Sequence, residues 1–320
     1  MIEYRSFHNT DPPRLVKLWN ECQLGRGAAI GFTTDAFETL NLSQPYFDRD
    51  GLIVACNDER VVGFVHAGFC VNEDQTALNK NQGVICAVMV HPDFRHQGIG
   101  RELIHRAEKY LEKQGATSQV AGAFELCDPF YVGMYGGTRP AGFLESDPSA
   151  GVFFQALGYE KSRVNLIYQR DLAHEKEPMD FKLAAVRRKM ELAISQQPEK
   201  PTWWWVTRFG RLDTIRFLLL PKKGGPAVAG VTVLGLDLYS HKWNERAIGL
   251  TDLFVTEEER RNRYGQMLVS EVCKKMKEEL VTLAEIHIVE ENEAAKELIQ
   301  KCGFKQIDRG IVYQKNNKNK

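Results

Sequence analysis

The second half of the chain repeats the first, and this repeat constrains the fold more than any other feature of the sequence. Residues of a loop and helix in the first half recur 165 positions later. The matched pairs are Val90 and Val255, Arg95 and Arg260, Gly100 and Gly265, and Leu103 and Leu268. One period of about half the chain is typical of two copies of one fold, whereas solenoids repeat every ~20–50 residues.

The repeat predicts two domains, which also suits a chain of 320 residues at roughly 150 residues per domain. We expect an N-terminal domain at 1–172 and a C-terminal domain at 181–320. The linker between them is predicted at 173–180, because this segment is polar and contains Pro178.

Strands and helices alternate along the first copy. A hairpin is predicted at 51–67, a strand at 84–90, a helix at 98–113 and a further strand at 119–126. The helix carries one apolar stripe, which is typical of a helix that covers a sheet. Its residues are Ile99, Leu103, Ile104, Ala107 and Leu111. In the second half, Trp203–Trp205 is predicted to lie in a strand and to pack in a core or interface, with a ligand cleft as the alternative.

Composition excludes several function classes. Lys plus Arg and Asp plus Glu each number 42, so there is no basic excess to favour nucleic acid or an anionic membrane. The longest apolar runs, such as 217–220, are far shorter than the ~20 residues of a membrane span. The start of the chain lacks a basic segment followed by an apolar one. Seven cysteines without a Cys-x-x-Cys pair therefore suggest reduced thiols in a cytoplasmic protein, and no ligand cluster predicts a metal.

One segment carries recognisable chemistry. The apolar strand Val88-Met89-Val90 ends at His91-Pro92, and the loop Arg95-His96-Gln97-Gly98-Ile99-Gly100 opens the helix. The first amides of a helix have no partner within it, and they lie at the positive end of its dipole. Because the glycines remove side chains, a phosphate can approach this backbone closely. The segment therefore predicts a pyrophosphate site.

This loop resembles the acetyl-CoA signature of the GCN5-related N-acetyltransferase (GNAT) superfamily, and the resemblance extends over most of both halves. It implies an α/β fold of two tandem acyl-CoA N-acyltransferase domains, each a mixed, mostly antiparallel sheet flanked by helices and splayed between its fourth and fifth strands. It also implies acetyl-CoA as cosubstrate. The main chains of Val88 and Val90 would hold the pantetheine arm, and the loop amides the pyrophosphate. The cofactor residues implied are Val88, Met89, Val90, Arg95, His96, Gln97, Gly98, Ile99, Gly100 and Arg101.

The second copy departs from this signature. Arg263 replaces the first loop glycine, Glu257 replaces the proline, and two more acids follow at Glu258 and Glu259. We expect this copy to have lost cofactor binding, because a side chain now occupies the place of close approach. The alternative is that the loop tolerates Arg263 with its side chain turned outward.

The family often supplies a tyrosine as acid for the leaving thiolate, in a pattern that ends in Gly-Phe. Here the matching positions hold Phe154 and Ile299, neither of which donates a proton. The Gly-rich segment after Asp128 offers Tyr135 as first candidate and Tyr131 as second. The alternative is that both tyrosines only pack the loop.

Four further residues are candidates in the chemistry. Glu125, on the strand predicted beside the thioester, is the candidate general base if burial raises its pKa; the alternative is a solvated carboxylate at the strand edge. His66 lies in the hairpin and either faces the acceptor or is a structural histidine. Cys86 and Cys127 suggest a covalent acetyl-thiol path only if a base lies beside one of them, and small buried cysteines are more common.

Together these features predict an N-acetyltransferase whose N-terminal copy moves an acetyl group from acetyl-CoA to an amine. The alternatives are a catalytically silent CoA-binding sensor or scaffold, and transfer of a longer acyl group. Net neutrality gives no reason to expect a charged macromolecule as acceptor, and a small-molecule amine is the predicted partner. The identity of the amine and the oligomeric state are left open by the sequence.

Overall fold

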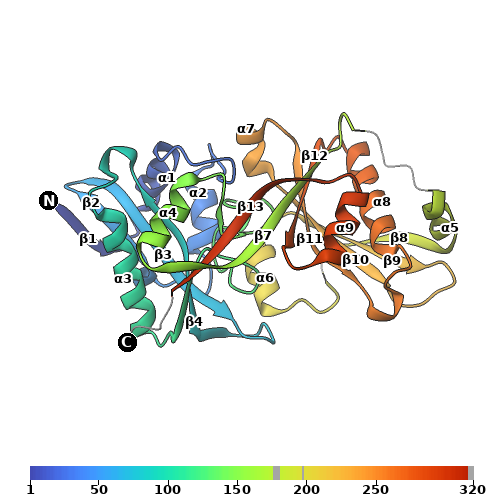
Figure 1. Cartoon of the computed structure of the whole chain (residues 1–320), viewed down its shortest axis with the longest axis horizontal. Coiled ribbons are helices and arrows are strands. Elements are labelled where there is room, and N and C mark those ends of the chain that lie inside the picture. Colours follow the sequence, from blue (N-terminus) through green and yellow to red (C-terminus); the bar gives the residue numbers. More distant parts are fainter. Residues whose placement is uncertain (176–180, 197, 316–320) are drawn as a thin grey trace. The chain divides into compact units, whose positions relative to one another are not determined.

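The computed structural model divides the chain into two compact units (Figure 1). Unit 1 comprises Met1–Val164, Thr202–Arg211 and Arg309–Lys320, and unit 2 comprises Asn165–Pro201 and Leu212–Asp308. Within these ranges the structure describes residues 1–175, 181–196 and 198–315. Residues 176–180 of the predicted linker lie outside the described part of the chain.

Unit 1 is a sheet in the order β1-β2-β3-β4-β5-β13, in which the neighbours are antiparallel except for the parallel pair β4 and β5. Its strands are β1 (Ile2–Ser6), β2 (Leu52–Asn57), β3 (Arg60–Val71), β4 (Leu78–Val90), β5 (Ser118–Ala121), β6 (Phe143–Leu144) and the end of β13 (Lys305–Lys315). Its helices are α1 (Pro12–Glu21), α2 (Thr34–Phe37), α3 (Ile99–Lys113), α4 (Pro148–Ala156) and α6 (Trp203–Phe209), with short turns η1 (Glu38–Leu42), η2 (Arg49–Gly51) and η3 (Pro92–Phe94).

The apolar stripe predicted on α3 is buried, and it covers one face of this sheet. Ile99, Leu103 and Leu111 are at most 2% exposed and pack with Val65 and Ile85 of the sheet. Each such side chain contributes roughly 1.5–3 kcal/mol on full burial. The stripe therefore fixes the helix, and with it the loop that precedes the helix, against the end of β4.

The sheet opens between β4 and β5. These strands pair only from Gln82–Ile85 to Ser118–Ala121. Immediately beyond, the register of β4 against β3 shifts by one residue at Cys86, between the pairs His66–Ala87 and Ala67–Ile85. Such a bulge bends a strand and ends its pairing. Residues 86–90 therefore pair with β3 on one side and, in the described part of the chain, are not paired with β5 on the other.

Unit 2 repeats this plan with the strand order β7-β12-β11-β10-β9-β8. Its strands are β7 (Tyr159–Asp171, entering at Asn165), β8 (Met190–Ser195), β9 (Thr214–Pro221), β10 (Ala229–Gly235), β11 (Ala247–Val255) and β12 (Leu283–Val289). Its helices are α5 (Phe181–Lys189), α7 (Ser240–Trp243), α8 (Tyr264–Glu278) and α9 (Glu293–Lys301), with turns η4 (Asp237–Tyr239) and η5 (Glu257–Glu259). β11 and β12 are parallel and pair only as far as Leu250 and Ile286, so this sheet opens at the equivalent place.

Two predicted strands are wrong in part. The strand predicted at 119–126 ends at Ala121, because Gly122 takes a positive φ of 98° and turns the chain. Trp203–Trp205 begins helix α6 instead of a strand. Thr202 caps this helix, since its hydroxyl accepts a hydrogen bond from the Trp205 amide at 3.1 Å.

Cys70 and Cys127 form a disulfide, so the expectation that all seven thiols are reduced is wrong for this pair. The end of β3 and the turn after β5 meet here, and the Val71 amide donates to the Leu126 carbonyl at 2.8 Å. The remaining cysteines are buried and are not disulfide-bonded; they are Cys22, Cys56, Cys86, Cys273 and Cys302.

Candidate functional site

The loop between β4 and α3 presents backbone to its surroundings. His96 and Gly98 both take the left-handed conformation, with φ of 61° and 82°. A Cβ built at Gly98 would meet no atom within 4 Å, so the main chain there borders open space. Gly98 is the residue before α3, and the next amides belong to the first turn of the helix, where they lack intrahelical partners. This arrangement suits an anion such as a pyrophosphate.

The side chains of the loop brace it. Arg95 donates from Nε to the Val90 carbonyl and from Nη2 to the Cys22 carbonyl, each at 3.0 Å, and thereby ties the end of β4 to the end of α1. Gln97 donates to the Asp93 carbonyl at 3.2 Å. Gly98 and Arg101 are exposed, whereas Ile99 points into the core at 2% exposure. The main chain around Gly98 is therefore open to a ligand, beside the exposed side chains of His96 and Arg101.

Gly100 has a different role from Gly98. A Cβ at Gly100 would lie 3.1 Å from the ring of Phe153 on α4. The equivalent Gly265 in unit 2 would place a Cβ 2.6 Å from Leu298 on α9. In both copies the glycine at this position lets another helix, α4 or α9, pack closely against the first turn of the helix that follows the loop. The cofactor contact predicted for Gly100 stays a prediction.

The loop of unit 2 keeps the same backbone shape. Arg261 and Arg263 take positive φ of 66° and 65°, as His96 and Gly98 do in unit 1. A cavity of about 1000 Å³ lies between the end of β11, this loop and α9, and Arg260, Arg261 and Arg263 are among the residues that line it. The substitution of the first glycine has therefore changed the side chains of the site without collapsing the loop.

The two candidate tyrosines lie in different surroundings. Tyr135 is half-buried, pairs through its backbone with Ala28, and accepts a hydrogen bond at Oη from the Leu144 amide at 3.3 Å. Tyr131 is 2% exposed, and its Oη lies 3.0 Å from Nδ1 of His66. The sequence does not predict this contact, because His66 and Tyr131 are 65 residues apart and no local pattern pairs them.

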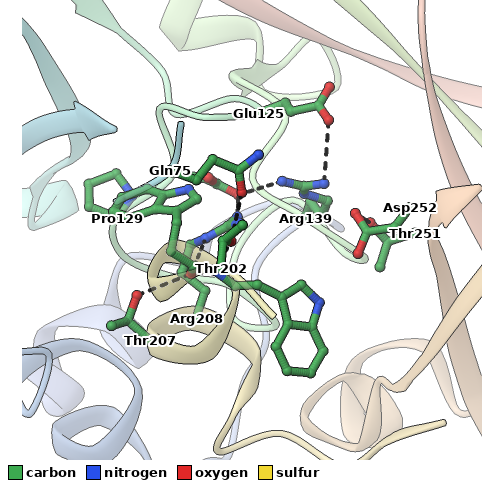
Figure 2. A network of polar contacts seen from close by, with 12 residues as sticks. Gln75, Glu125, Pro129, Arg139, Thr202, Thr207, Arg208, Thr251 and Asp252 are labelled. Carbon is green, nitrogen blue, oxygen red and sulfur yellow. Dashed lines mark hydrogen bonds and ion pairs between the residues drawn. The ribbon is translucent and has the colours of Figure 1, made fainter. Parts of the chain in front are cut away.

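Glu125 does not have the environment that its proposed role as base requires. It lies in a turn after the end of β5, and its side chain is 58% exposed. Its carboxylate is 3.8 Å from Arg139, a contact that is visible in Figure 2. The predicted burial is absent because β5 ends at Ala121, before it reaches Glu125.

A buried ionic contact that the sequence analysis missed holds the tyrosine segment. Asp128 is fully buried, with Arg208 Nη1 at 2.5 Å and Arg139 Nη2 at 3.3 Å from its Oδ2. Arg208 lies on α6, where its guanidinium also packs over the ring of Trp204 at 4.9 Å. At the start of the same helix, Thr202 donates to Gln75 at 2.9 Å. The segment 202–211 is therefore an integral part of unit 1.

The positions that often hold the family's tyrosine are core positions here. Phe154 on α4 is 1% exposed and stacks on Tyr313, and Ile299 on α9 is fully buried. Among the described residues, no group of three or more His, Cys, Asp or Glu side chains forms a metal site. No helix in the same residues is long and apolar enough to cross a membrane.

Comparison with known families decides the assignment. The sequence matches the acetyltransferase (GNAT) family over residues 13–143 and again over 188–304. The chain belongs to this family. The two matches also confirm the prediction of tandem GNAT domains with a mixed, mostly antiparallel sheet.

Solved structures share this tandem GNAT fold. A tandem GNAT protein from the clavulanic acid biosynthesis pathway matches over 98% of both chains, with 18% identity and a TM-score of 0.67. A glucosamine N-acetyltransferase region of a fungal multi-domain GH3 β-N-acetylglucosaminidase matches 98% of this chain and 38% of that one, with 18% identity and a TM-score of 0.73. N-myristoyltransferase from Saccharomyces cerevisiae matches 98% and 80% of the two chains, with 11% identity and a TM-score of 0.61. At these identities the likeness concerns the fold alone. No curated protein sequence matches the chain.

Proposed function

We propose that the protein is an N-acetyltransferase that moves an acetyl group from acetyl-CoA to an amine, and that the N-terminal GNAT copy performs the reaction. The observation that carries this proposal is the loop at Gly98, where accessible left-handed backbone lies between the open edge of β4 and the first turn of α3. The loop amides from His96 to Arg101 would hold the pyrophosphate, and the main chains of Val88 and Val90 the pantetheine arm.

The protein must assist the reaction in three ways. The attacking amine must lose a proton, the oxyanion of the tetrahedral adduct must be stabilised, and the leaving thiolate must gain a proton. The C–N bond forms as the C–S bond breaks, so the products are an amide and CoA. A backbone amide of β4 near Val90 is the proposed oxyanion donor, and the segment 131–135 supplies the tyrosine acid. Glu125 is withdrawn as base because it is exposed.

A second candidate function is a catalytically silent CoA-binding sensor or scaffold. The specific observation in its favour is that Phe154 and Ile299 are buried apolar residues at the positions where the family often has its acid. The two candidates share the cofactor site, so cofactor binding by itself does not separate them.

The first experiment is a calorimetric titration of the full chain with acetyl-CoA, followed by measurement of CoA thiol release with a panel of amines. Glucosamine heads the panel, because one structural neighbour is a glucosamine N-acetyltransferase region; amino acids, a polyamine, an aminoglycoside and a lysine peptide complete it. We expect one binding site and amine-dependent thiol release. Binding without release by any amine would favour the silent alternative.

The stoichiometry also tests the role of the second copy. We propose that Arg263 prevents cofactor binding there, so the Arg263→Gly variant should bind a second equivalent of acetyl-CoA. Two equivalents in the wild-type chain would contradict the assignment of a single site. No binding at all would contradict the proposed function and would favour a role in protein interactions.

A further inference from the structure

His66 lies beside the bulge at which β4 leaves β5. It pairs with Ala87, the residue that follows the bulged Cys86. The side chain is fully buried, and its ring stacks on Phe130 at 3.9 Å and meets Phe47 edge-on at 5.8 Å. The imidazole of His66 on β3 therefore lies in an aromatic cluster, next to the edge of β4 that is open beyond β5.

Only one nitrogen of this imidazole has a partner. Nδ1 is 3.0 Å from Oη of Tyr131, whereas Nε2 is buried and has no hydrogen bond with any described residue. Buried polar atoms of native proteins are nearly always paired, and unpaired N–H groups are rarer than unpaired acceptors. A proton on Nδ1 leaves Nε2 as an unpaired acceptor and frees the Tyr131 hydroxyl proton for another acceptor, whereas a proton on Nε2 leaves a buried N–H unpaired.

The tautomer determines what the phenol can do. If Nδ1–H donates to Oη, the Tyr131 hydroxyl has an acceptor site filled and its own proton is not used by His66. The opposite tautomer would point the phenolic proton at His66. Burial lowers the pKa of His66 to about 3, so the ring stays uncharged at neutral pH. Burial also raises the pKa of Tyr131 well above 10, so the phenol stays protonated.

The position of Tyr131 is independently fixed. Its backbone amide donates to Asn41 Oδ1 at 2.8 Å, and its ring stacks on Trp19 with centroids 5.7 Å apart. The residue also takes a left-handed φ of 67°, which is uncommon outside glycine. A tyrosine that merely filled space would not need a strained backbone, a buried amide contact and a buried imidazole at its hydroxyl.

We propose that Tyr131 is the acid of the acyl transfer and that His66 is its positioning residue, which donates from Nδ1 to Oη and leaves the hydroxyl proton for the leaving sulfur. This rests on the proposed function. As the C–S bond breaks, the proton passes from Oη to the thiolate, and the Nδ1–H bond stabilises the phenolate formed. The proton released by the attacking amine restores the phenol.

The tautomer is tested without turnover. Two-bond ¹H–¹⁵N correlation spectra of the histidine-labelled full chain report which nitrogen of His66 carries the proton, and the His66→Asn variant assigns the signal. We expect a neutral ring protonated at Nδ1 from pH 6 to 8. A ring protonated at Nε2, or a charged ring, would overturn the proposal whatever the enzyme does.

Measurements of turnover distinguish a positioning role of His66 from a packing role. With acetyl-CoA and the best amine of the panel, Tyr131→Phe should lower kcat by about 100-fold or more with little change in the KM for acetyl-CoA. His66→Phe, which keeps an aromatic ring but no donor, should lower kcat by about tenfold. His66→Asn places an N–H near the position of Nδ1 and should retain more of the rate, although Asn packs less well among aromatic rings. Tyr135→Phe tests the competing candidate. Tyr110→Phe, which removes a hydroxyl that donates to Asp48 at 2.9 Å, is the matched control and should leave kcat within about twofold.

The failures are distinguishable. A wild-type chain that binds acetyl-CoA but acetylates no amine contradicts the proposed function. A wild-type chain that turns over while His66→Asn loses as much rate as His66→Phe contradicts the role of His66 alone. A loss of rate in Tyr135→Phe that matches the one expected for Tyr131→Phe would transfer the acid to Tyr135.

Discussion

At the scale of single residues, the two loop glycines lie in different surroundings, although the sequence presents them as one Gly-x-Gly pair. Gly98 borders open space and Gly100 faces Phe153. The distinction lies in the direction of a missing Cβ, which spacing along the sequence does not encode. Arg263 shows that a larger residue can take the backbone conformation of Gly98, at a cost of roughly 1–2 kcal/mol for a left-handed L-residue.

Gly98→Ala is therefore expected to weaken acetyl-CoA binding at least tenfold and to lower the free energy of unfolding by about 1 kcal/mol. Gly98→Arg should abolish binding. Gly115 is the matched control, because its φ is 109° and a Cβ there also meets nothing within 4 Å. Gly115→Ala should lower stability similarly and leave affinity unchanged. Calorimetry and urea denaturation measure the two effects, and equal losses of affinity in both alanine variants would refute the close-approach argument.

At the scale of elements, α1 is joined to β1 by a buried ion pair. Arg5 donates two hydrogen bonds of 2.7 Å to Asp11, the residue before α1, and the His8 amide donates a third at 2.7 Å. Burial acts to raise the pKa of Asp11, but the bonds to Arg5 and His8 outweigh it, and the pKa falls below its ordinary value of 3.8. α1 carries Trp19 and ends at Cys22, so this pair also positions one wall of the site.

The pH dependence follows from that direction. A carboxylate whose pKa is lowered on folding stabilises the protein above its unfolded pKa, and the contribution disappears as the pH falls through the folded value. Asp11→Asn should therefore lower the free energy of unfolding by about 2 kcal/mol at pH 7, and the difference from wild type should shrink below pH 3.8. Glu59→Gln, which alters a 96% exposed carboxylate, should change stability by less than about 0.5 kcal/mol. A urea-unfolding series from pH 7 to 3 measures both, and a pH-independent difference would contradict the assignment.

The sequence predicted best the elements with an apolar pattern that recurs over several turns, or with a proline that ends a strand. The α3 stripe recurs over four turns, and Pro92 ends β4 near the expected residue. α6 was missed because three tryptophans carry no strong helical signal, while the capping role of Thr202 emerges only with the structure. The contacts of Asp128 with Arg208 and of His66 with Tyr131 join residues 80 and 65 positions apart, and one sequence holds no information that pairs them.

At the scale of the whole molecule, the compact units do not follow the order of the chain. The end of β13, from the last part of the sequence, completes the sheet of unit 1, where Tyr313 pairs with Ala121 of β5 and stacks on Phe154. Lys315 Nζ then reaches Glu108 of α3 at 2.7 Å. The internal repeat predicted two similar domains. A repeat shows that two segments are alike, but it does not show to which of the two sheets a given strand belongs.

This exchange of segments makes a prediction about fragments. Residues 1–172 by themselves lack both β13 and α6, so β5 keeps an unpaired edge, and Phe154 and Asp128 lose buried partners. We expect this fragment to be unfolded or aggregated, with exposed apolar surface and no cooperative thermal transition. A fragment of residues 1–164 joined through short flexible linkers to 202–211 and 305–315 should recover a cooperative transition and acetyl-CoA binding. The informative control is the same fusion with Arg208→Met, which leaves Asp128 without its closest partner and should lose about 3 kcal/mol. Cooperative folding of residues 1–172 alone would show that the sheet of the first copy is sufficient without the distant segments.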